Sequence, residues 1–344
     1  MYALILAGGF ATRLWPLTKD FPKPLLPLGE KRIIEYALHS MLKVELEKVF
    51  ISTNAAFEHI FLEWVRKSRY VVPNKTELIF EPSISEEKKL GAIKGIDYDL
   101  REIGRRYRIG DLLIVAGDNI YDVNLASFID TFRRKGAPVV AVKEIESKEE
   151  ARRFAVVEVD DEGKILNFEE KPKKPRSTLI ATAIYALPKD CVELIRRYLG
   201  EGNNPDAPGY FFQWLTKKID VYAYKFEGFW FDIGAPKGYF DALKSLLRKT
   251  YISSKATVDG KIIGPSYIGN NVKVSEGSVV GPYAVICDGV TIRNSHINTA
   301  LVMENSMIEY TKIFQTLVGY RATIKGGIIE NSVLAGHTKL NIKH

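Results

Sequence analysis

The chain has 344 residues, which is enough for two domains of ordinary size. Hydrophobic residues make up 46% and charged residues 26%, a composition typical of packed globular proteins and unlike that of disordered chains. The net charge of +7 favours anionic ligands, but no long basic run is interleaved with aromatic residues, so we expect small anions rather than nucleic acid.

The sequence favours a cytoplasmic protein. Cys191 and Cys287 lie far apart without metal-type spacing, which is typical of a reducing compartment. The apolar residues 1–7 run directly into glycines without a charged leader, so we expect a buried strand there rather than a signal peptide. No apolar run approaches the roughly 18 residues that span a bilayer, so we expect no membrane segment. The scarcity of glutamine beside many Lys and Glu residues suggests a thermophilic source.

Strand-like and helix-like segments alternate through about residue 250. Short apolar runs predict buried strands at residues 4–6, 48–52, 77–80, 112–115 and 139–142. Helical spacing predicts helices at residues 33–42, 57–67, 91–101 and 125–134. This alternation predicts an α/β domain over residues 1–250, with a mostly parallel, doubly wound, Rossmann-like sheet. Ligands bind at the carboxyl ends of such strands, so chemistry is expected in the loops after Leu6, Phe80 and Val115.

A different pattern follows over residues 251–344. Aliphatic residues recur every six positions, at Ile262, Ile268, Val274, Val280, Ile286 and Ile292. This period fits neither a helix nor a simple strand, but it fits a parallel β-helix built from hexapeptide-type repeats, for which we expect the left-handed form. With about eighteen residues per coil, the tail predicts roughly five coils. An antiparallel tail with coincidental spacing is the alternative.

The first predicted strand leads into a loop of small residues followed by two cations. Exposed backbone N–H groups of such a loop can bind an anion. Arg13 and Lys23 follow; an arginine can bind a polyphosphate bidentately, and a lysine acts as a movable point charge. The loop is not a Walker motif, because no Lys-Ser/Thr pair follows its glycines, and its glycine spacing is not that of a dinucleotide site.

This opening resembles that of the sugar-1-phosphate nucleotidylyltransferases. The family includes long-form glucose-1-phosphate thymidylyl- and uridylyltransferases and mannose-1-phosphate guanylyltransferases. The matching residues are Gly8, Gly9, Thr12, Arg13, Leu14, Pro16, Leu17, Thr18, Pro22, Lys23, Leu25 and Pro27. Ala11 replaces a family glycine, and because alanine tolerates positive φ poorly, we expect a somewhat different loop path.

The resemblance implies roles for further residues up to about residue 240. Asp118 and Asp232 match the carboxylates that hold the catalytic Mg²⁺, and Glu170 and Lys171 match an element that binds the sugar phosphate. Arg13 and Lys23 match the catalytic cations. The implied nucleotide-binding residues are Leu6, Ala7, Gly8, Gly9, Thr12, Glu81 and Gly91. Ala155 and Ala183 stand where the family often has glycine beside the sugar.

The base preference is left open by Glu81. Thymidylyl and uridylyl members tend to have a glutamine there, which can both donate to and accept from a pyrimidine, whereas an ionised glutamate only accepts. A glutamate suits the two adjacent donors of guanine, although Glu86 is an alternative base contact.

The resemblance therefore implies an enzyme that joins a sugar-1-phosphate to a nucleoside triphosphate and releases pyrophosphate. We expect glucose-1-phosphate with dTTP or UTP; the alternatives are a mannose-1-phosphate guanylyltransferase and a non-catalytic nucleotide-sugar-binding paralogue. The expected partners are these substrates and further copies of the chain, and the tail is expected to serve oligomerisation or regulation rather than acyl transfer.

Overall fold

In the computed structural model, which describes residues 1–342, the chain forms two compact units. The first contains Met1–Gly9 and Glu35–Trp230, and the second contains Phe10–Ile34 and the chain from Phe231 onward. These units are defined by contacts and differ from the predicted domains, because Phe10–Ile34 is grouped with the tail. The predicted domain boundary at residue 250 therefore stays a prediction. Within residues 1–342, no helix is both long and apolar enough to cross a bilayer.

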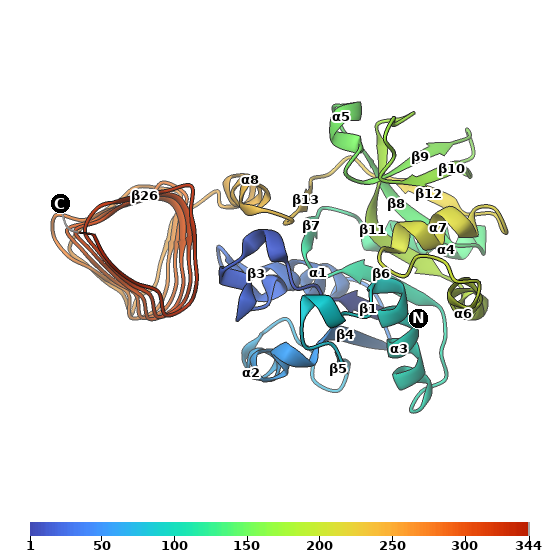
Figure 1. The fold of residues 1–344 in the computed structure, drawn as a ribbon, viewed down its shortest axis with the longest axis horizontal. Coiled ribbons are helices and arrows are strands. Elements are labelled where there is room, and N and C mark those ends of the chain that lie inside the picture. The colour runs from blue at the N-terminus through green and yellow to red at the C-terminus, as the bar shows by residue number, and fades with distance from the viewer. Residues whose placement is uncertain (343–344) are drawn as a thin grey trace. The chain divides into compact units, whose positions relative to one another are not determined.

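The first unit contains a twisted, mostly parallel sheet with helices packed on it (Figure 1). The strand order is β10-β9-β11-β6-β1-β4-β5, and β8 pairs with both β11 and β12. The strands are β1 (Tyr2–Leu6), β4 (Lys48–Asn54), β5 (Thr76–Glu81), β6 (Leu112–Ala116), β7 (Asn119–Tyr121), β8 (Val139–Glu144), β9 (Ala155–Val159), β10 (Ile165–Glu170), β11 (Leu179–Leu187) and β12 (Tyr222–Lys225). The helices are α1 (Ile33–Met41), α2 (Glu58–Lys67), α3 (Ala92–Gly104), α4 (Leu125–Lys135), α5 (Lys148–Ala151), α6 (Val192–Gly200) and α7 (Pro208–Leu215).

All five strands and all four helices expected from the sequence are therefore confirmed, with ends that shift by a few residues at most. The sheet departs from the parallel pattern at β11, which runs antiparallel to β6, β8 and β9. Its length of nine residues lets one strand join the parallel core to the β9–β10 hairpin.

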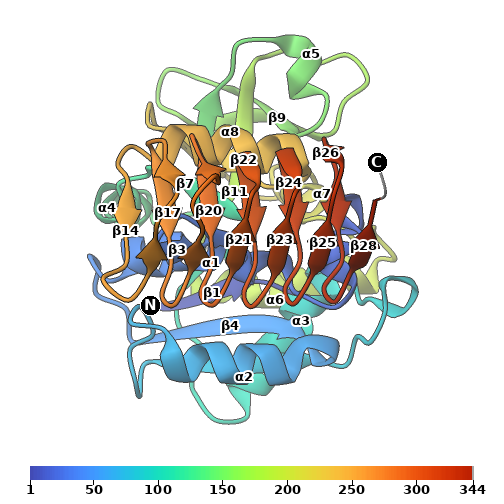
Figure 2. The same cartoon turned by 90° about the vertical axis from the view of Figure 1, so that its left-hand side faces the viewer.

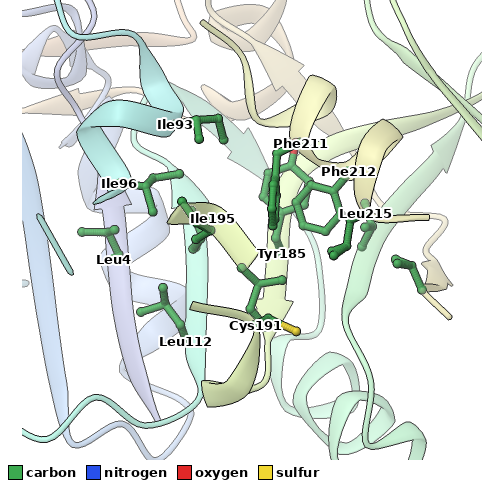
Figure 3. Packing of buried hydrophobic residues seen from close by; sticks show 14 of the residues in the cluster. Leu4, Ile93, Ile96, Leu112, Tyr185, Cys191, Ile195, Phe211, Phe212 and Leu215 are labelled. Carbon is green, nitrogen blue, oxygen red and sulfur yellow. The ribbon is translucent and has the colours of Figure 1, made fainter. Parts of the chain in front are cut away.

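An aromatic and aliphatic core fixes α7 against the sheet (Figure 3). The ring of Phe212 on α7 stacks on Tyr185 of β11, with ring centroids 4.3 Å apart. Phe212 also stacks on Phe168 of β10 at 6.0 Å. Burial of large aromatic side chains is a major source of stability, so these contacts hold α7 in a defined position beside the end of β10.

The second unit begins with a segment of tight turns. Phe10–Ile34 contains the 3₁₀ turns η1 (Thr12–Leu14), η2 (Leu17–Lys19) and η3 (Lys23–Leu25) and the short hairpin of β2 (Pro27–Leu28) and β3 (Lys31–Arg32). Its four prolines, Pro16, Pro22, Pro24 and Pro27, lack the backbone N–H that a continuous helix requires. Helix α8 (Pro236–Leu246) belongs to the same unit, and its Tyr239 hydroxyl donates to the Pro27 carbonyl at 2.6 Å.

The rest of the unit is a parallel β-helix, seen along its coil in Figure 1 and from the side in Figure 2. Its strands are β14 (Tyr251–Ile252), β15 (Thr257–Val258), β16 (Lys261–Ile262), β17 (Ser266–Ile268), β18 (Lys273–Val274), β19 (Val279–Val280), β20 (Ala284–Ile286), β21 (Thr291–Arg293), β22 (His296–Val302), β23 (Met307–Glu309), β24 (Lys312–Val318), β25 (Thr323–Lys325), β26 (Ile328–Glu330), β27 (Val333–Leu334) and β28 (Lys339–Asn341).

The six-residue period is confirmed as the inward-facing set of the coil. Its six members all belong to or pack against one apolar cluster inside the β-helix. Ser266 pairs with Ala284, eighteen positions later, whereas Thr291 pairs with Met307, only sixteen positions later. This shortening explains why the six-residue period fades after Ile292. It also explains why one face carries six strands in the described residues, one more than the expected five coils.

Candidate functional site

The sheet register brings the predicted nucleotide-binding loop beside two other strand ends. Leu6, the last residue of β1, lies opposite Ser52 of β4 on one side and Ala116 of β6 on the other. On the far side of β4, Asn54 lies opposite Glu81. The loops after β1, β5 and β6 therefore lie along one edge of the sheet, as expected for a parallel α/β fold.

The carboxylate of Glu81 is enclosed between two glycines. A Cβ on Gly8 would lie 3.0 Å from Glu81 Oε1, and a Cβ on Gly95 of α3 would lie 2.9 Å from the same oxygen. The Ser52 hydroxyl donates to Oε1 at 2.9 Å. The Asn54 amide donates through Nδ2 to the Gly8 carbonyl, while its buried Oδ1 has no hydrogen-bond partner among residues 1–342. The loop of Gly8 thus borders a buried set of hydrogen-bond acceptors.

Burial shifts the titration of this acidic set. It raises the pKa of the Glu81 carboxyl, an effect that the hydrogen bond from Ser52 reduces. Burial also raises the pKa of the Asp99 carboxyl on α3 well above its usual value, and the charge of Glu81 raises it further. Neither Asp99 oxygen has a hydrogen-bond partner in the described chain. Burial and the charge of Glu81 therefore both favour the neutral form of the Asp99 carboxyl.

Asp118 follows β6 at the same edge of the sheet. Gly117 precedes it and donates its backbone N–H to the Leu6 carbonyl at 2.8 Å. A Cβ on Gly117 would lie 3.0 Å from that carbonyl oxygen and from Ile5 Cγ2, so glycine permits the close approach of the two strand ends. The half-buried Asp118 side chain accepts a hydrogen bond from Asn119 Nδ2 at 3.3 Å.

Gly91 lies close to the backbone of Pro205. It has φ +83°, and an added Cβ would lie 2.8 Å from the Pro205 carbonyl oxygen. The first N–H groups of α3, from Ala92 and Ile93, donate to the carbonyls of Asp206 and Pro205. These two donors are therefore occupied by protein acceptors. Glu86, the alternative base contact, accepts from Lys89 Nζ at 2.5 Å.

Glu170 and Lys171 lie at the end of β10. The Glu170 side chain is only 8% exposed, and its Oε1 lies 3.7 Å from Lys171 Nζ. Its backbone N–H donates to Gln213 Oε1 of α7 at 3.1 Å. A Cβ on Gly209 of α7 would lie 1.7 Å from Glu170 Oε2. Burial raises the pKa of the Glu170 carboxyl, and the neighbouring Lys171 charge partly offsets this rise.

The two alanines at family glycine positions differ in their backbone conformation. Ala155 lies opposite Glu170 in the β9–β10 ladder. Ala183 has φ +57°, where the pairing of β11 with β8 is irregular between Ala181 and Tyr185. Positive φ at a residue with a Cβ costs about 1–2 kcal/mol, so Ala183 holds a bulge that glycine would hold more easily.

The second unit carries the remaining predicted residues. Thr12 and Arg13 lie exposed in η1, whereas Lys23 of η3 is 7% exposed. Asp232 is the last residue of β13 (Trp230–Asp232). A Cβ added to Gly234 would lie 2.9 Å from Asp232 Oδ2 and 3.5 Å from Arg13 Nη1. Because both atoms lie close to this one point, the Asp232 carboxylate and the Arg13 guanidinium are near each other.

Ala11 keeps the conformation that a glycine would favour. Its φ of 49° and ψ of 50° place it in the left-handed region. The Thr18 hydroxyl donates to the Ala11 carbonyl at 2.8 Å, and the Leu14 N–H donates to it at 2.9 Å. These bonds hold the turn despite the Cβ. Ala11 thus adopts the left-handed conformation that a glycine would adopt, and its Cβ does not force the backbone at this residue out of that conformation.

The carboxylates suit a magnesium ion by their chemistry. Asp118 and Asp232 offer hard oxygen donors, and Mg²⁺ in phosphate-binding proteins typically takes one or two protein carboxylates together with substrate phosphates and water. Within residues 1–342, no group of three or more His, Cys, Asp or Glu residues could hold a metal through protein ligands alone. Each of the two aspartates is, by its chemistry, a suitable donor to an ion whose other ligands come from substrate and water.

Sequence reasoning missed several residues around these side chains. They are Ser52, Asn54, Gly95 and Asp99 near Glu81, and Gly209 and Gln213 near Glu170. For Ser52 and Asn54 a signal existed, because they end the predicted strand beside β1. For the helical residues no sequence signal was available, since helix packing brings them to the site.

The chain resembles several proteins of related names. A family model described as nucleotidyl transferase matches residues 2–249. A UTP–glucose-1-phosphate uridylyltransferase of Synechocystis is 28% identical, covering 86% of this chain and 82% of that protein. A provisionally named mannose-1-phosphate guanyltransferase of Sulfolobus acidocaldarius is 30% identical, covering 81% of this chain and 74% of that protein. A glucose-1-phosphate adenylyltransferase of Bacillus thuringiensis is 29% identical, covering 95% and 93%.

The fold is also shared with a crystal structure from Bacillus anthracis, provisionally named a glucose-1-phosphate thymidylyltransferase. The TM-score is 0.62 at 20% identity, covering 74% of this chain and 98% of that chain. The family match spans more than two thirds of the sequence and includes every residue of the candidate site. The chain therefore belongs to the nucleotidyl transferase family.

Proposed function

We propose that this enzyme transfers a nucleotidyl group from a nucleoside triphosphate to a sugar-1-phosphate and releases pyrophosphate. The observation that carries the proposal is the register of β1, β4, β5 and β6, which sets the glycine loop, Glu81 and Asp118 along one sheet edge. The enclosed Glu170 with its neighbour Lys171 adds a carboxylate and a cation of the kind that hold a sugar phosphate.

In the proposed reaction, a sugar phosphate oxygen attacks the α-phosphorus in line. A new oxygen–phosphorus bond forms as the bond to the β-phosphate oxygen breaks, and pyrophosphate leaves with that electron pair. The nucleophile needs no general base, because a phosphate monoester has a second pKa of about 6 and is ionised at neutral pH. Catalysis then rests on positioning and on neutralising negative charge.

The residues divide this work. Arg13 stabilises the departing pyrophosphate, and Lys23 neutralises charge at the α-phosphate. Glu170 accepts hydrogen bonds from sugar hydroxyls while Lys171 binds the sugar phosphate. Asp118 and Asp232 would hold Mg²⁺, which when bound supplies further positive charge beside the phosphates.

Pyrophosphate release tests the proposal. It should require Mg²⁺ and both substrates, and Lys23→Ala and Asp232→Ala should each lower turnover about 10²- to 10³-fold in folded protein. Near-normal turnover in either variant would refute the assigned roles. Binding of a nucleotide-sugar without any turnover in the unmodified chain would instead identify a non-catalytic paralogue.

The proposed substrates are glucose-1-phosphate with dTTP or UTP, as in the uridylyl and thymidylyl relatives. A pyrimidine would match Glu81 in its protonated form, because a protonated carboxyl can donate and accept as a glutamine does. The second candidate is mannose-1-phosphate with GTP. An ionised Glu81 would match guanine, because its oxygens only accept hydrogen bonds and guanine offers two adjacent donors. Asn54 Oδ1, which has no hydrogen-bond partner within residues 1–342, is a further acceptor at the same sheet edge.

A substrate panel separates the two candidates. Five nucleoside triphosphates against glucose-, mannose-, galactose- and N-acetylglucosamine-1-phosphate should show one preferred pair. The proposal also includes a cytoplasmic homo-oligomer in which the β-helix serves assembly or regulation. The two buried free cysteines fit a reducing compartment.

A further inference from the structure

An arginine ties the segment that carries Lys23 to the β-helix. Arg32, in β3, donates from Nη1 to the Leu25 carbonyl at 2.6 Å and from Nη2 to Glu304 Oε1 at 2.9 Å. Leu25 belongs to the same 3₁₀ turn as Lys23, whereas Glu304 lies in the β-helix between β22 and β23. One guanidinium thus links the turn of a predicted catalytic lysine to the tail.

Aromatic rings reinforce this link. The guanidinium of Arg32 lies 5.9 Å from the ring centroid of Phe21, two residues before Lys23. The Phe21 ring in turn lies 6.1 Å from that of Tyr320 in the β-helix. Tyr320 is itself held edge-to-face by His337 at 5.0 Å. The Lys23 turn is therefore linked to the coil directly through Phe21 and indirectly through Arg32.

The β-helix has a covered apolar face as well as these polar contacts. Val285, Leu301 and Leu317 stand opposite one another in consecutive coils. Their chain neighbours Ala284 and Ala300 point into the coil, so side-chain alternation directs these three residues outward. Each nevertheless has 0% exposure. Both views show β3 and α8 of the same unit alongside the coil (Figures 1 and 2).

We infer that Arg32 is a positioning residue, which holds the Lys23 turn in place by anchoring it to Glu304 of the β-helix. The Lys23 segment is made of short 3₁₀ turns, a two-residue hairpin and proline-containing stretches rather than a continuous helix or a long strand. A displacement of about 1 Å at a reacting group can cost two orders of magnitude in rate, so an external anchor has catalytic value. The inference rests on the proposed function for the role of Lys23.

The geometry of the anchor favours arginine over lysine. The planar guanidinium reaches two acceptors, a carbonyl and a carboxylate, while its Cζ lies over the Phe21 ring. The Arg32 and Glu304 side chains are 29% and 28% exposed, so the pair is partly screened and its removal should leave the coil folded. A lysine would keep the charge but could not hold both acceptors in one plane.

A double-mutant cycle tests the inference. The variants are Arg32→Met, Glu304→Met and the double variant, with Arg32→Lys as the conservative change. Arg32→Met should lower kcat about 10- to 100-fold and leave the KM for sugar-1-phosphate within about twofold, because the sugar-binding residues lie elsewhere. Arg32→Lys should recover part of the loss. The double variant should lose no more than Arg32→Met alone.

The ion pair between Arg293 and Glu309, at 2.8 Å on the β-helix, supplies a matched control, and Arg293→Met should leave kcat within about twofold. Amide hydrogen exchange over residues 21–28 gives a second measurement that needs no activity. Exchange there should quicken in Arg32→Met and in Glu304→Met but not in the control. Unchanged exchange, a kcat within twofold of the parent, or additive losses in the double variant would overturn the inference. An inactive parent chain would refute the proposed function instead, and exchange would still decide whether the anchor exists.

Discussion

Gly209 and Glu170 approach so closely that a Cβ on residue 209 would lie 1.7 Å from Glu170 Oε2. Gly209 lies in the first turn of α7, and the helix is held in place by the stacking of Phe212 on Tyr185. Neither the helix nor the strand end can retreat without disturbing this core. The glycine therefore determines where the Glu170 carboxylate points.

Gly209→Ala should displace the Glu170 side chain from its enclosed position. We expect the KM for sugar-1-phosphate to rise tenfold or more, since a group that binds the sugar would be misplaced. Initial-rate kinetics with varied sugar-1-phosphate would measure this. Gly200→Ala on α6 is the control, because its Cβ would meet no atom within 4 Å, and it should leave the KM unchanged. An unchanged KM in Gly209→Ala would remove Glu170 from sugar binding.

Glu81→Gln should fix the base preference on pyrimidines. A glutamine always presents one donor and one acceptor, whereas the glutamate does so only when protonated. Loss or gain of one matched hydrogen bond is worth about 1–3 kcal/mol, so the ratio of kcat/KM for UTP over GTP should rise roughly tenfold or more. The exposed Glu87→Gln change should leave the ratio as it is. An unchanged ratio would exclude Glu81 from base recognition, and a fall would contradict the expected match of the glutamine to a pyrimidine.

The buried Asp99 should make stability depend on pH. Burial raises the pKa of its carboxyl in the folded chain, so the folded state binds a proton that the unfolded state has already released. This stabilisation is complete below the usual pKa of an aspartate and is lost as the pH rises through the higher folded pKa. Asp99→Asn should thus be more stable than the parent at neutral pH and less pH-dependent.

Thermal unfolding between pH 4 and 8 would measure this, with the exposed Asp130→Asn as the control. The control should keep the pH profile of the parent. An Asp99→Asn variant that unfolds at a lower temperature than the parent at pH 8 would contradict the expected cost of the buried carboxylate.

Ala11→Gly should stabilise the chain. Left-handed backbone costs alanine about 1–2 kcal/mol, while glycine adopts it freely but loses more entropy on folding. We expect a net rise of roughly 0.5–1 kcal/mol in the free energy of unfolding, measured by chemical denaturation. Turnover should be retained, because Arg13 and Lys23 are untouched. A lower free energy of unfolding would show that the alanine makes contacts worth more than the strain.

The sequence predicted those elements whose pattern is local. The buried strands and the β-helix were visible because apolar runs and a six-residue period are properties of neighbouring residues. The Glu81 and Asp118 strand ends followed from the rule for parallel sheets. By contrast, Gly95, Gly209 and Gln213 reach the site through helix packing, which no local pattern encodes. The shortening of the coils from eighteen to sixteen residues could be seen in the sequence only because the six-residue period of aliphatic residues fades after Ile292.

The domain division shows the same limit in another way. The sequence changes pattern near residue 250, but the compact units follow contacts, and Phe10–Ile34 is grouped with the tail. Arg32 and Glu304 are separated by 272 positions. Neither residue stands out in the sequence, because an arginine and a glutamate are ordinary surface residues. Their pairing appears only once the chain is folded.

This grouping has a consequence for exchanging parts between relatives. A chimera cut at residue 250 would join a foreign β-helix to an opening segment evolved against another coil. Such an exchange should work only if residues 10–34 are exchanged together with the tail, although the two segments lie far apart in the sequence. Substitutions at Phe21, Arg32, Glu304 and Tyr320 should accordingly be inherited together, so that variation in the tail constrains variation in residues 10–34.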